Sequence, residues 1–293
     1  MNFLFWNLNG KSIPTPVANL AHEHDIDVLI LAECKQDMVC DILLALNRPT
    51  PRKYSLAHWP PQRVDMAFLA RLPHGSVEVV DYDERTCVRR LRPPVGLDVV
   101  LVHAHFPSKR YCSAHHQEQY CRRVAEMISK AEQRVGHQRT VLVGDLNMNP
   151  FECGMARANG LHGVMARQIA RKGGRRVFGE FRPFFYNPMW SHFGDWPSGP
   201  PGTYYYPSSD ELAYFWHMFD QVLVRPELLD RFEDGHLRIP TEAGATRLLD
   251  GSGLPDRRAS SDHLPLIFAL DLYKGAMNDL GEKAKPVGRP AGS

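Results

Sequence analysis

Polar side chains at the ends of short apolar runs are the residues of this sequence that could do chemistry. The run "TVLVG" ends at Asp145, and Asn147 follows two residues later. On an extended segment an Asp-x-Asn pair places both side chains on the same side of the chain. The carboxylate could then accept a proton from water while the amide holds a phosphate oxygen. Taken alone, the motif is more simply explained as an Asx turn, so its meaning depends on residues elsewhere.

Other acids, amides and histidines occupy similar places along the chain. They are Asn7, Glu33, His103, His105, Asp220, Asp262 and His263. Ligand sites in layered α/β folds gather where strands end, so we expect these side chains to converge. Carboxylates and amides without a cysteine or histidine cage suit a hard cation, Mg²⁺ or Mn²⁺. Such an ion polarises a phosphoryl oxygen or lowers the pKa of a bound water.

Each of these residues also has a structural explanation. Glu33 could form a surface ion pair with Lys35, Asp262 could cap a turn, and His105 could be an ordinary half-buried histidine. No Gly-x-Ser-x-Gly motif supplies a covalent nucleophile. The coincidence of several such residues at predicted strand ends favours the chemical interpretation.

Short β-rich runs recur from one end of the chain to the other, among them "NFLFWNL", "DVLILAE", "DVVLVHAHF" and "PLIFALDL". Their length and flanking turn residues predict buried strands. Helices are predicted at "ANLAHEHD" and at residues 113–135, where apolar residues fall on one face. Strands interleaved with helices indicate an α/β or α+β fold.

Two regions depart from this pattern. Residues 165–203 are rich in Gly, Pro, Arg and aromatics, and we predict a long surface loop there. Residues 274–293 lack aromatic and β-branched clusters, which predicts a disordered C-terminal tail. Apolar strands occur on both sides of every loop, so residues 1–273 are predicted to form a single domain.

Composition excludes some classes of protein and leaves others open. The chain has 293 residues and a formal net charge of +2, so net charge alone does not call for a polyanionic partner. No apolar run approaches the roughly 20 residues of a membrane span. The six cysteines include no Cys-x-x-Cys pair, which argues against a zinc site. The N-terminus looks like a strand and not a signal peptide, so we expect reduced thiols and a cytoplasmic location.

A cluster of cations and rings in the middle of the chain predicts a substrate-binding surface. Four cations, Arg171, Lys172, Arg175 and Arg176, have no acid among them, and aromatic residues follow as far as Trp216. Cations for phosphates and flat rings for bases are what single-strand or distorted-duplex binding requires. The alternative is a solvated loop whose aromatics simply hold it down. The balance favours a nucleic-acid partner, DNA or RNA.

The order of the motifs resembles the endonuclease/exonuclease/phosphatase superfamily, which includes exonuclease III, abasic-site endonucleases, DNase I and inositol-phosphate phosphatases. The resemblance rests on "WNLNG", "LAEC", "VHAHFPS", "GDLNMNP", "FDQVLV" and "SSDHLPL". It implies a four-layer α/β/β/α sandwich of two packed mixed sheets flanked by helices, with the active site at one edge.

The resemblance also implies roles for individual residues. Asp145 would activate the attacking water, and Asn147 would bind the scissile phosphate. Asn7 would orient the base and its surroundings, and His105 would lie near the phosphate.

The remaining anchors would hold the metal and stabilise the transition state. Glu33 would be the principal metal ligand, and Asp262 would bind the metal directly or through water. Asp220 would orient His263, which would stabilise the phosphoryl transition state.

These roles predict a divalent-metal-dependent phosphodiesterase, specifically a nuclease that cuts DNA or RNA by direct water attack. Two alternatives stay open because one fold of this kind serves many substrates. One is a phosphatase or phosphodiesterase for a small phosphoester, such as a lipid head group, sugar phosphate or nucleotide. The other is an inactive nucleic-acid-binding module.

Overall fold

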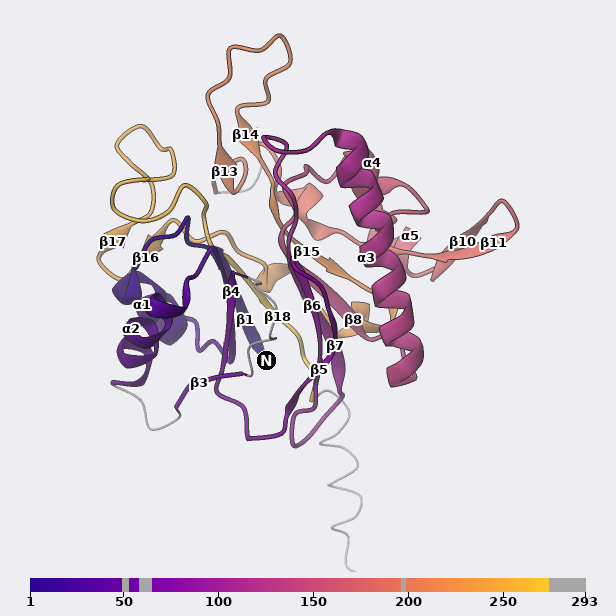
Figure 1. Ribbon diagram of the computed structural model, residues 1–293, viewed down its shortest axis with the longest axis horizontal. Coiled ribbons are helices and arrows are strands. Elements are labelled where there is room, and N and C mark those ends of the chain that lie inside the picture. Colours follow the sequence, from indigo (N-terminus) through magenta and orange to yellow (C-terminus); the bar gives the residue numbers. More distant parts are fainter. Residues whose placement is uncertain (49–52, 58–64, 196–198, 274–293) are drawn as a thin grey trace, which may run out of the picture.

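Two β-sheets pack face to face between helices on both outer sides (Figure 1). The computed structural model describes residues 1–48, 53–57, 65–195 and 199–273. The first sheet has five strands in the order β18-β1-β2-β4-β3, and the second has seven in the order β5-β6-β7-β8-β15-β12-β9. Both sheets are mixed: β1 runs parallel to β2, β7 runs parallel to β8, and antiparallel pairs surround them. The predicted four-layer sandwich is confirmed.

The strands of the two sheets begin and end as follows. The first sheet comprises β1 (Asn2–Asn7), β2 (Val28–Ala32), β3 (Ser55–Leu56), β4 (Met66–Ala70) and β18 (Leu266–Ala269). The second sheet comprises β5 (Val77–Tyr82), β6 (Thr86–Leu91), β7 (Val99–His105), β8 (Thr140–Asp145), β9 (Gly163–Val164), β12 (Phe185–Tyr186) and β15 (Asp220–Val224).

Three small hairpins and several helices complete the structure. The hairpins are β10 (Gly174–Val177) with β11 (Glu180–Pro183), β13 (Tyr204–Tyr205) with β14 (Trp216–His217), and β16 (Glu242–Ala243) with β17 (Thr246–Arg247). The α-helices are α1 (Pro14–Glu23), α2 (Gln36–Asn47), α3 (Ala114–Val135), α4 (Cys153–Ala156) and α5 (Arg167–Ala170). The 3₁₀-helices are η1 (Pro188–His192), η2 (Pro226–Arg231) and η3 (Asp234–His236).

The central strands are apolar on both faces because both faces are covered. In β1, Phe3 and Phe5 enter the core between the sheets, while Leu4 and Trp6 enter the core beneath α1 and α2. In β8, the side chain of Leu142 instead packs under α3. This coverage explains why the strands appear in the sequence as unbroken apolar runs that stop abruptly at polar residues.

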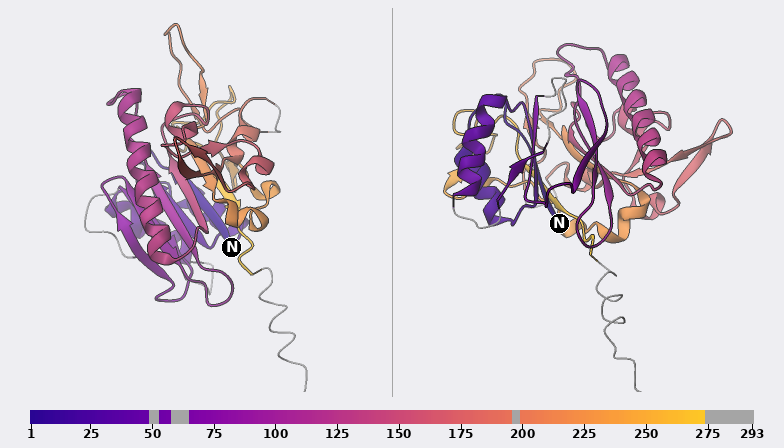
Figure 2. Two further views of the ribbon diagram at one scale, coloured as in Figure 1. Left: turned by 90° about the vertical axis from the view of Figure 1, so that its right-hand side faces the viewer. Right: turned by 60° about the horizontal axis from the view of Figure 1, so that its bottom comes forward.

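Helix α3 covers the outer face of the second sheet (Figure 2). It begins after Ser113, whose side chain accepts a hydrogen bond from the backbone N–H of His116, and ends at Gly136 with a left-handed φ of 86°. Its own residues Val124 and Ile128 are fully buried, each contributing about 1.5–3 kcal/mol of hydrophobic stabilisation. The helix predicted for residues 113–135 is thus confirmed to within one residue.

The prediction of a long loop over residues 165–203 is wrong in part. This region contains α5, the β10–β11 hairpin, η1 and strand β12, which hydrogen-bonds to both β9 and β15 in the second sheet. Strands of two to four residues are shorter than the usual five or six and too short to give a recognisable alternation. The tail predicted for residues 274–293 lies outside the described residues.

Two further features concern the whole described chain. None of its helices combines the length and the apolar character that crossing a membrane would require. All six cysteines are free.

Candidate active site

The second sheet brings three of the predicted site residues to one edge. Strands β7 and β8 are parallel and end together, so that His105 pairs with Asp145. Strand β15 runs antiparallel to β8 and begins where β8 ends, so that Asp220 also pairs with Asp145. Side chains from three neighbouring strands therefore meet at a single point.

The first sheet contributes a fourth and a fifth residue from across the sandwich. Asn7 is the last residue of β1 and pairs with Ala32, the last residue of β2, after which Glu33 follows at once. The Asn7 Nδ2 donates to Asp145 Oδ2 at 2.9 Å and lies 3.2 Å from Glu33 Oε1. One amide thus joins the carboxylates of both sheets.

Glu33 has a backbone conformation that few glutamates adopt. Its φ is 50°, in the left-handed region that side chains other than glycine rarely enter. Such a conformation costs of order 1–3 kcal/mol and is typical of functional sites. The carboxylate is 39% exposed and lies 3.7 Å from His105 Nε2, which is also 3.7 Å from Asp145 Oδ2.

Asp145 and Asn147 are held in place by the turn that the sequence alone suggested. The Asp145 side chain is buried, at 2% exposure, and its Oδ1 accepts a hydrogen bond from the backbone N–H of Asn147 at 3.0 Å. The Asn147 Nδ2 donates to the carbonyl of Phe106 at 3.0 Å. An amide nitrogen carries two hydrogens, so this bond fixes the side chain and leaves the second hydrogen for a ligand. The Asx turn and a chemical role are therefore compatible.

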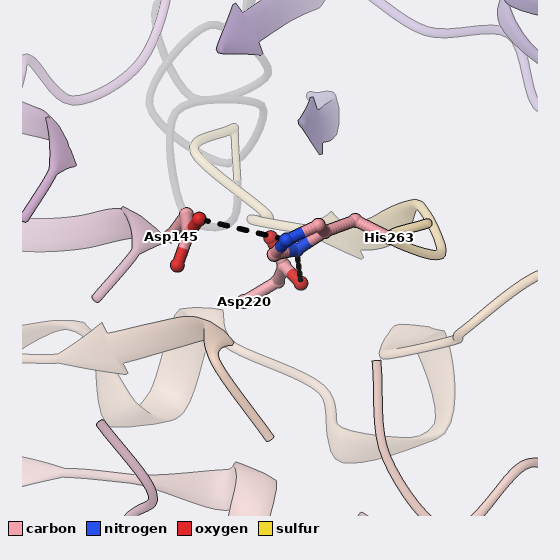
Figure 3. A group of neighbouring side chains, drawn as sticks. All are labelled: Asp145, Asp220 and His263. Carbon is pink, nitrogen blue, oxygen red and sulfur yellow. Dashed lines mark hydrogen bonds and ion pairs between the residues drawn. The ribbon is translucent and has the colours of Figure 1, made fainter. Parts of the chain in front are cut away.

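His263 lies between two buried carboxylates, as Figure 3 shows. Its Nδ1 is 2.8 Å from Asp220 Oδ2, and its Nε2 is 3.8 Å from Asp145 Oδ2. Burial acts to lower the pKa of His263, but the charges of Asp220 and Asp145 outweigh it and raise the pKa to about 10. Burial raises the pKa of Asp220, and the charge of His263 opposes that rise. The geometry favours a protonated imidazole whose Nδ1 donates to Asp220 and whose Nε2 lies within ion-pair distance of Asp145.

The loop that carries His263 is tied to β1. The Trp6 Nε1 donates to the carbonyl of His263 at 2.8 Å, and the Ser261 hydroxyl donates to the carbonyl of Asn7 at 2.7 Å. The same hydroxyl accepts from the backbone N–H of His263 at 3.2 Å. Asp262, on this loop, is near enough for its charge to help raise the pKa of His263.

Two places in this cluster have ligand atoms for a cation. Atoms of Asp145, Asp220 and His263 lie within 4.8 Å of one another, but an ion bound there would have to displace the proton that both carboxylates stabilise on His263. The oxygen-rich alternative is the partly exposed Glu33 carboxylate, which shares the Asn7 amide with Asp145; Asp262, on the loop of His263, is a second oxygen donor near the cluster. Oxygen ligands match Mg²⁺ or Mn²⁺ better than a protonated imidazole does.

The predicted substrate contacts do not all come to this edge. Arg171, Lys172, Arg175 and Arg176 lie on or just before the β10–β11 hairpin, where Arg171 pairs with Asp230 and the Arg175 Nε donates to His162 Nε2. That hairpin leads into β12, which pairs with β15 at Val224, the end opposite Asp220. Trp216 does come close, since its hairpin, β13–β14, adjoins the His263 loop.

One functional candidate, Tyr204, was missed in the sequence. It forms an isolated β-bridge with His263, and the two ring centroids are 4.6 Å apart. Burial raises the pKa of the Tyr204 hydroxyl, and the nearby charge of Asp262 raises it further. The hydroxyl therefore stays protonated and can donate a hydrogen bond close to the carboxylates. The sequence offered only the ring-rich run "GTYYYP", which does not distinguish Tyr204 from its neighbours.

The comparisons with known proteins agree with this architecture. The model of the family described as "Endonuclease/Exonuclease/phosphatase family" matches residues 4–263. No curated protein matches the sequence.

Solved structures show the same fold at low sequence identity. A family protein from Bacteroides thetaiotaomicron is 14% identical, with 92% of this chain and 97% of that chain covered and a TM-score of 0.57. An AP endonuclease from Archaeoglobus fulgidus is 14% identical, with 92% and 99% covered and a TM-score of 0.51. The 3′ phosphatase NExo from Neisseria, bound to a product DNA hairpin, is 18% identical, with 92% and 99% covered and a TM-score of 0.50.

Proposed function

The chain belongs to the endonuclease/exonuclease/phosphatase family, and from this premise we propose that it is a metal-dependent nuclease that hydrolyses DNA or RNA phosphodiester bonds by direct attack of water. Membership makes it a phosphoric-ester hydrolase. The observation that carries the finer proposal is the position of His263 between Asp145 and Asp220, beside the amide bridge from Asn7 to Glu33.

Asp145 is the general base of this proposal. Its Oδ1 and Oδ2 are held by the Asn147 backbone N–H and the Asn7 amide, so the carboxylate is fixed in position and stays an acceptor. A positioned base of this kind contributes about 10²–10⁴-fold to a rate. The free hydrogen on the Asn147 amide would hold the phosphate whose bond is cut, and His105 faces the same space.

His263 is the group that stabilises negative charge. With Asp220 holding Nδ1 and a proton on Nε2, the ring presents a charged donor toward the space beside Asp145. Charge-assisted donors in a buried site are worth several times a neutral hydrogen bond in water. Asp220 thus acts by positioning His263.

Glu33 and Asp262 would hold the cation, Mg²⁺ or Mn²⁺. Glu33 is partly exposed and, among the described residues, has no lysine or arginine within ion-pair distance that would compete for it. When bound, the ion supplies Lewis-acid polarisation of the phosphoryl oxygen. The strained backbone of Glu33 aims its carboxylate at the same space that Asp145 and His105 face.

A nucleic-acid substrate is supported by the surroundings of the site. The rings of Tyr204, Phe219 and His217 stack in sequence next to His263, with centroid distances of 5.4 Å and 4.6 Å between successive pairs. Two cations lie over them: Lys109 is 5.8 Å from the ring of Phe219, and Arg257 is 5.9 Å from that of Tyr204. Rings flanked by cations suit bases and phosphates. The Neisseria 3′ phosphatase of the same fold is bound to DNA. The cytoplasmic location expected from the sequence remains a prediction.

Labelled DNA, labelled RNA and a panel of small phosphoesters, each with Mg²⁺ and with a chelator, test the proposal. We expect metal-dependent cleavage of DNA or RNA and little turnover of the small esters. Turnover of the small esters alone would overturn the nuclease assignment in favour of a phosphatase. Binding of nucleic acid without any turnover under Mg²⁺ or Mn²⁺ would favour an inactive binding module.

A further inference from the structure

The β10–β11 hairpin has an apolar ring where its turn favours a small polar residue. Val177 pairs with Glu180, so Phe178 and Gly179 form the two-residue turn, with φ values of 50° and 82°. Two positive φ angles are the signature of a type I′ turn, for which Asn-Gly and Asp-Gly are strongly preferred. A bulky residue in this conformation is an outlier that costs of order 1–3 kcal/mol. The Phe178 side chain is fully exposed, so no packing against the described residues offsets that cost.

The rest of the hairpin has a second exposed ring and two arginines on directly opposite positions. Phe181 is 55% exposed. Arg175 lies directly across the ladder from Arg182, and like charges in such positions destabilise a sheet. Arg182 pairs with Glu180, which offsets part of this cost. Arg176 is exposed on the same hairpin. A sequence that places two local costs in one small element is consistent with selection for binding and not for stability.

A cleft separates the hairpin from helix α3. It has a volume of about 670 Å³ and is lined by Arg122 and Lys130 from the helix and by Phe181 and Arg182 from the hairpin. In the described part of the chain neither Arg122 nor Lys130 has a carboxylate within ion-pair distance. Glu126 also lines the cleft, so cations outnumber acids on the helix wall by one. The charge of this surface is complementary to an anionic polymer.

We propose that the β10–β11 hairpin and the facing side of α3 bind a single-stranded segment of nucleic acid, apart from the bond that is cut. The arginines contact phosphates, while Phe178 and Phe181 stack on unpaired bases, each stack being worth about 1–3 kcal/mol. This inference rests on the proposed nuclease function for its choice of polymer. The arginine fork, which matches phosphate oxygens two at a time, and a cleft in place of a flat face favour a nucleic acid over a membrane surface.

The surface is separate from the catalytic edge. Strand β12, which follows the hairpin, pairs with Val224, whereas Asp220 begins the same strand β15. These two ends are about 13 Å apart at about 3.3 Å per residue, and the hairpin projects farther from the body (Figures 1 and 2). Only a strand of several nucleotides can therefore contact both places, so the hairpin should affect long substrates and not short ones.

The test uses a triple variant, Phe178→Asn with Arg175→Gln and Arg176→Gln. Asn suits the turn better than Phe, so the variant should fold at least as stably as the wild type. Binding is measured by fluorescence anisotropy in a chelator on a labelled single strand of about 30 nucleotides, which is longer than the 4–16 nucleotides that one binding module covers. Cleavage is measured with Mg²⁺ on the same strand and on a dinucleotide, which is too short to contact both places. The matched control is Leu44→Asn with Arg48→Gln and Arg247→Gln, an exposed apolar residue and two exposed cations on the far layer.

We expect the triple variant to weaken binding of the long strand at least tenfold and to lower the salt slope by about 1.4, which corresponds to two phosphates at about 0.7 each. The cleavage rate of the dinucleotide and the behaviour of the control should not change. Unchanged affinity and salt slope for the long strand would overturn the inference. Hairpin-dependent binding to vesicles of anionic lipid, without binding to the oligonucleotide, would also overturn it.

The two proposals fail in different ways. If the wild type cleaves nucleic acid but the hairpin variant binds like the wild type, the inference fails and the nuclease assignment stands. If the wild type cleaves no nucleic acid but its binding depends on the hairpin, the nuclease assignment fails and the inference stands.

Discussion

Asp145 and Asp220 are direct partners across the β8–β15 ladder, and both side chains are almost completely buried. Two like charges in this position destabilise a sheet, and burial adds a desolvation cost. His263 lies between them and offsets the repulsion with hydrogen bonding and charge. The histidine reduces the cost of two buried neighbouring carboxylates, and the three residues together are better suited to catalysis than to stability.

Asp220→Asn should separate these two properties. The change removes one of two buried like charges, so we expect an unchanged or higher melting temperature. His263 loses the partner that fixes its ring and raises its pKa, so the rate of phosphodiester cleavage should fall by about 10²–10⁴-fold. Single-turnover kinetics and thermal unfolding measure both. Asp41→Asn, which removes an exposed carboxylate on α2, is the control, and a near-normal rate for Asp220→Asn would show that Asp220 does not position His263.

Glu33→Gln tests the metal site. The two side chains have nearly the same shape, so the fold and the bond from Asn7 should survive while a charged ligand is lost. We expect the affinity for Mn²⁺, measured by calorimetry or electron paramagnetic resonance, to fall at least tenfold, since even residues beyond the direct ligands of a metal contribute about 10–100-fold. Glu180→Gln, an exposed acid on the β10–β11 hairpin, should bind Mn²⁺ like the wild type. Undiminished affinity in Glu33→Gln would place the ion on other residues.

Asp98 should make the stability of the fold depend on pH. Burial alone would raise the pKa of Asp98, but hydrogen bonds from Arg90, Arg139 and His137 hold it well below its usual value. Because the folded pKa lies below the unfolded value of about 3.9, the ionised carboxylate stabilises the fold above about pH 4. This contribution is lost as the pH falls toward the folded pKa.

Asp98→Asn therefore should lower the free energy of unfolding by about 2 kcal/mol at neutral pH. The difference from the wild type should shrink as the pH falls toward about pH 3, as followed by urea unfolding. A difference that stays constant over that range would contradict the assignment of this ion-pair group as a pH-dependent stabiliser.

The sequence predicted the layers and the converging strand ends for a physical reason. Strands such as β1 and β8 are covered on both faces, so their apolar runs are unbroken and stop at Asn7 and Asp145. Polar residues that terminate such apolar runs therefore had to lie where the strands end. The strands of each parallel pair, β1–β2 and β7–β8, end side by side, so each sheet brings two such polar ends together.

The sequence could not show which end of the second sheet a short strand or hairpin lies next to. Arg175 and Arg176 precede a strand of only two residues, β12, and its pairing with the far end of β15 is a tertiary choice. Tyr204 likewise resembles Tyr205 and Tyr206 in the sequence, and only the bridge to His263 distinguishes it.

The central claim is that the Asp145 carboxylate is the general base, and the single-turnover rate of Asp145→Asn with saturating Mg²⁺ tests it most directly. Asn fills the same space and can still contact the Asn147 backbone and Asn7, but it cannot accept a proton from water. We predict a rate about 10²–10⁴-fold below that of the wild type, with an unchanged circular dichroism spectrum and unchanged metal affinity. A rate close to that of the wild type would show that the base is another residue.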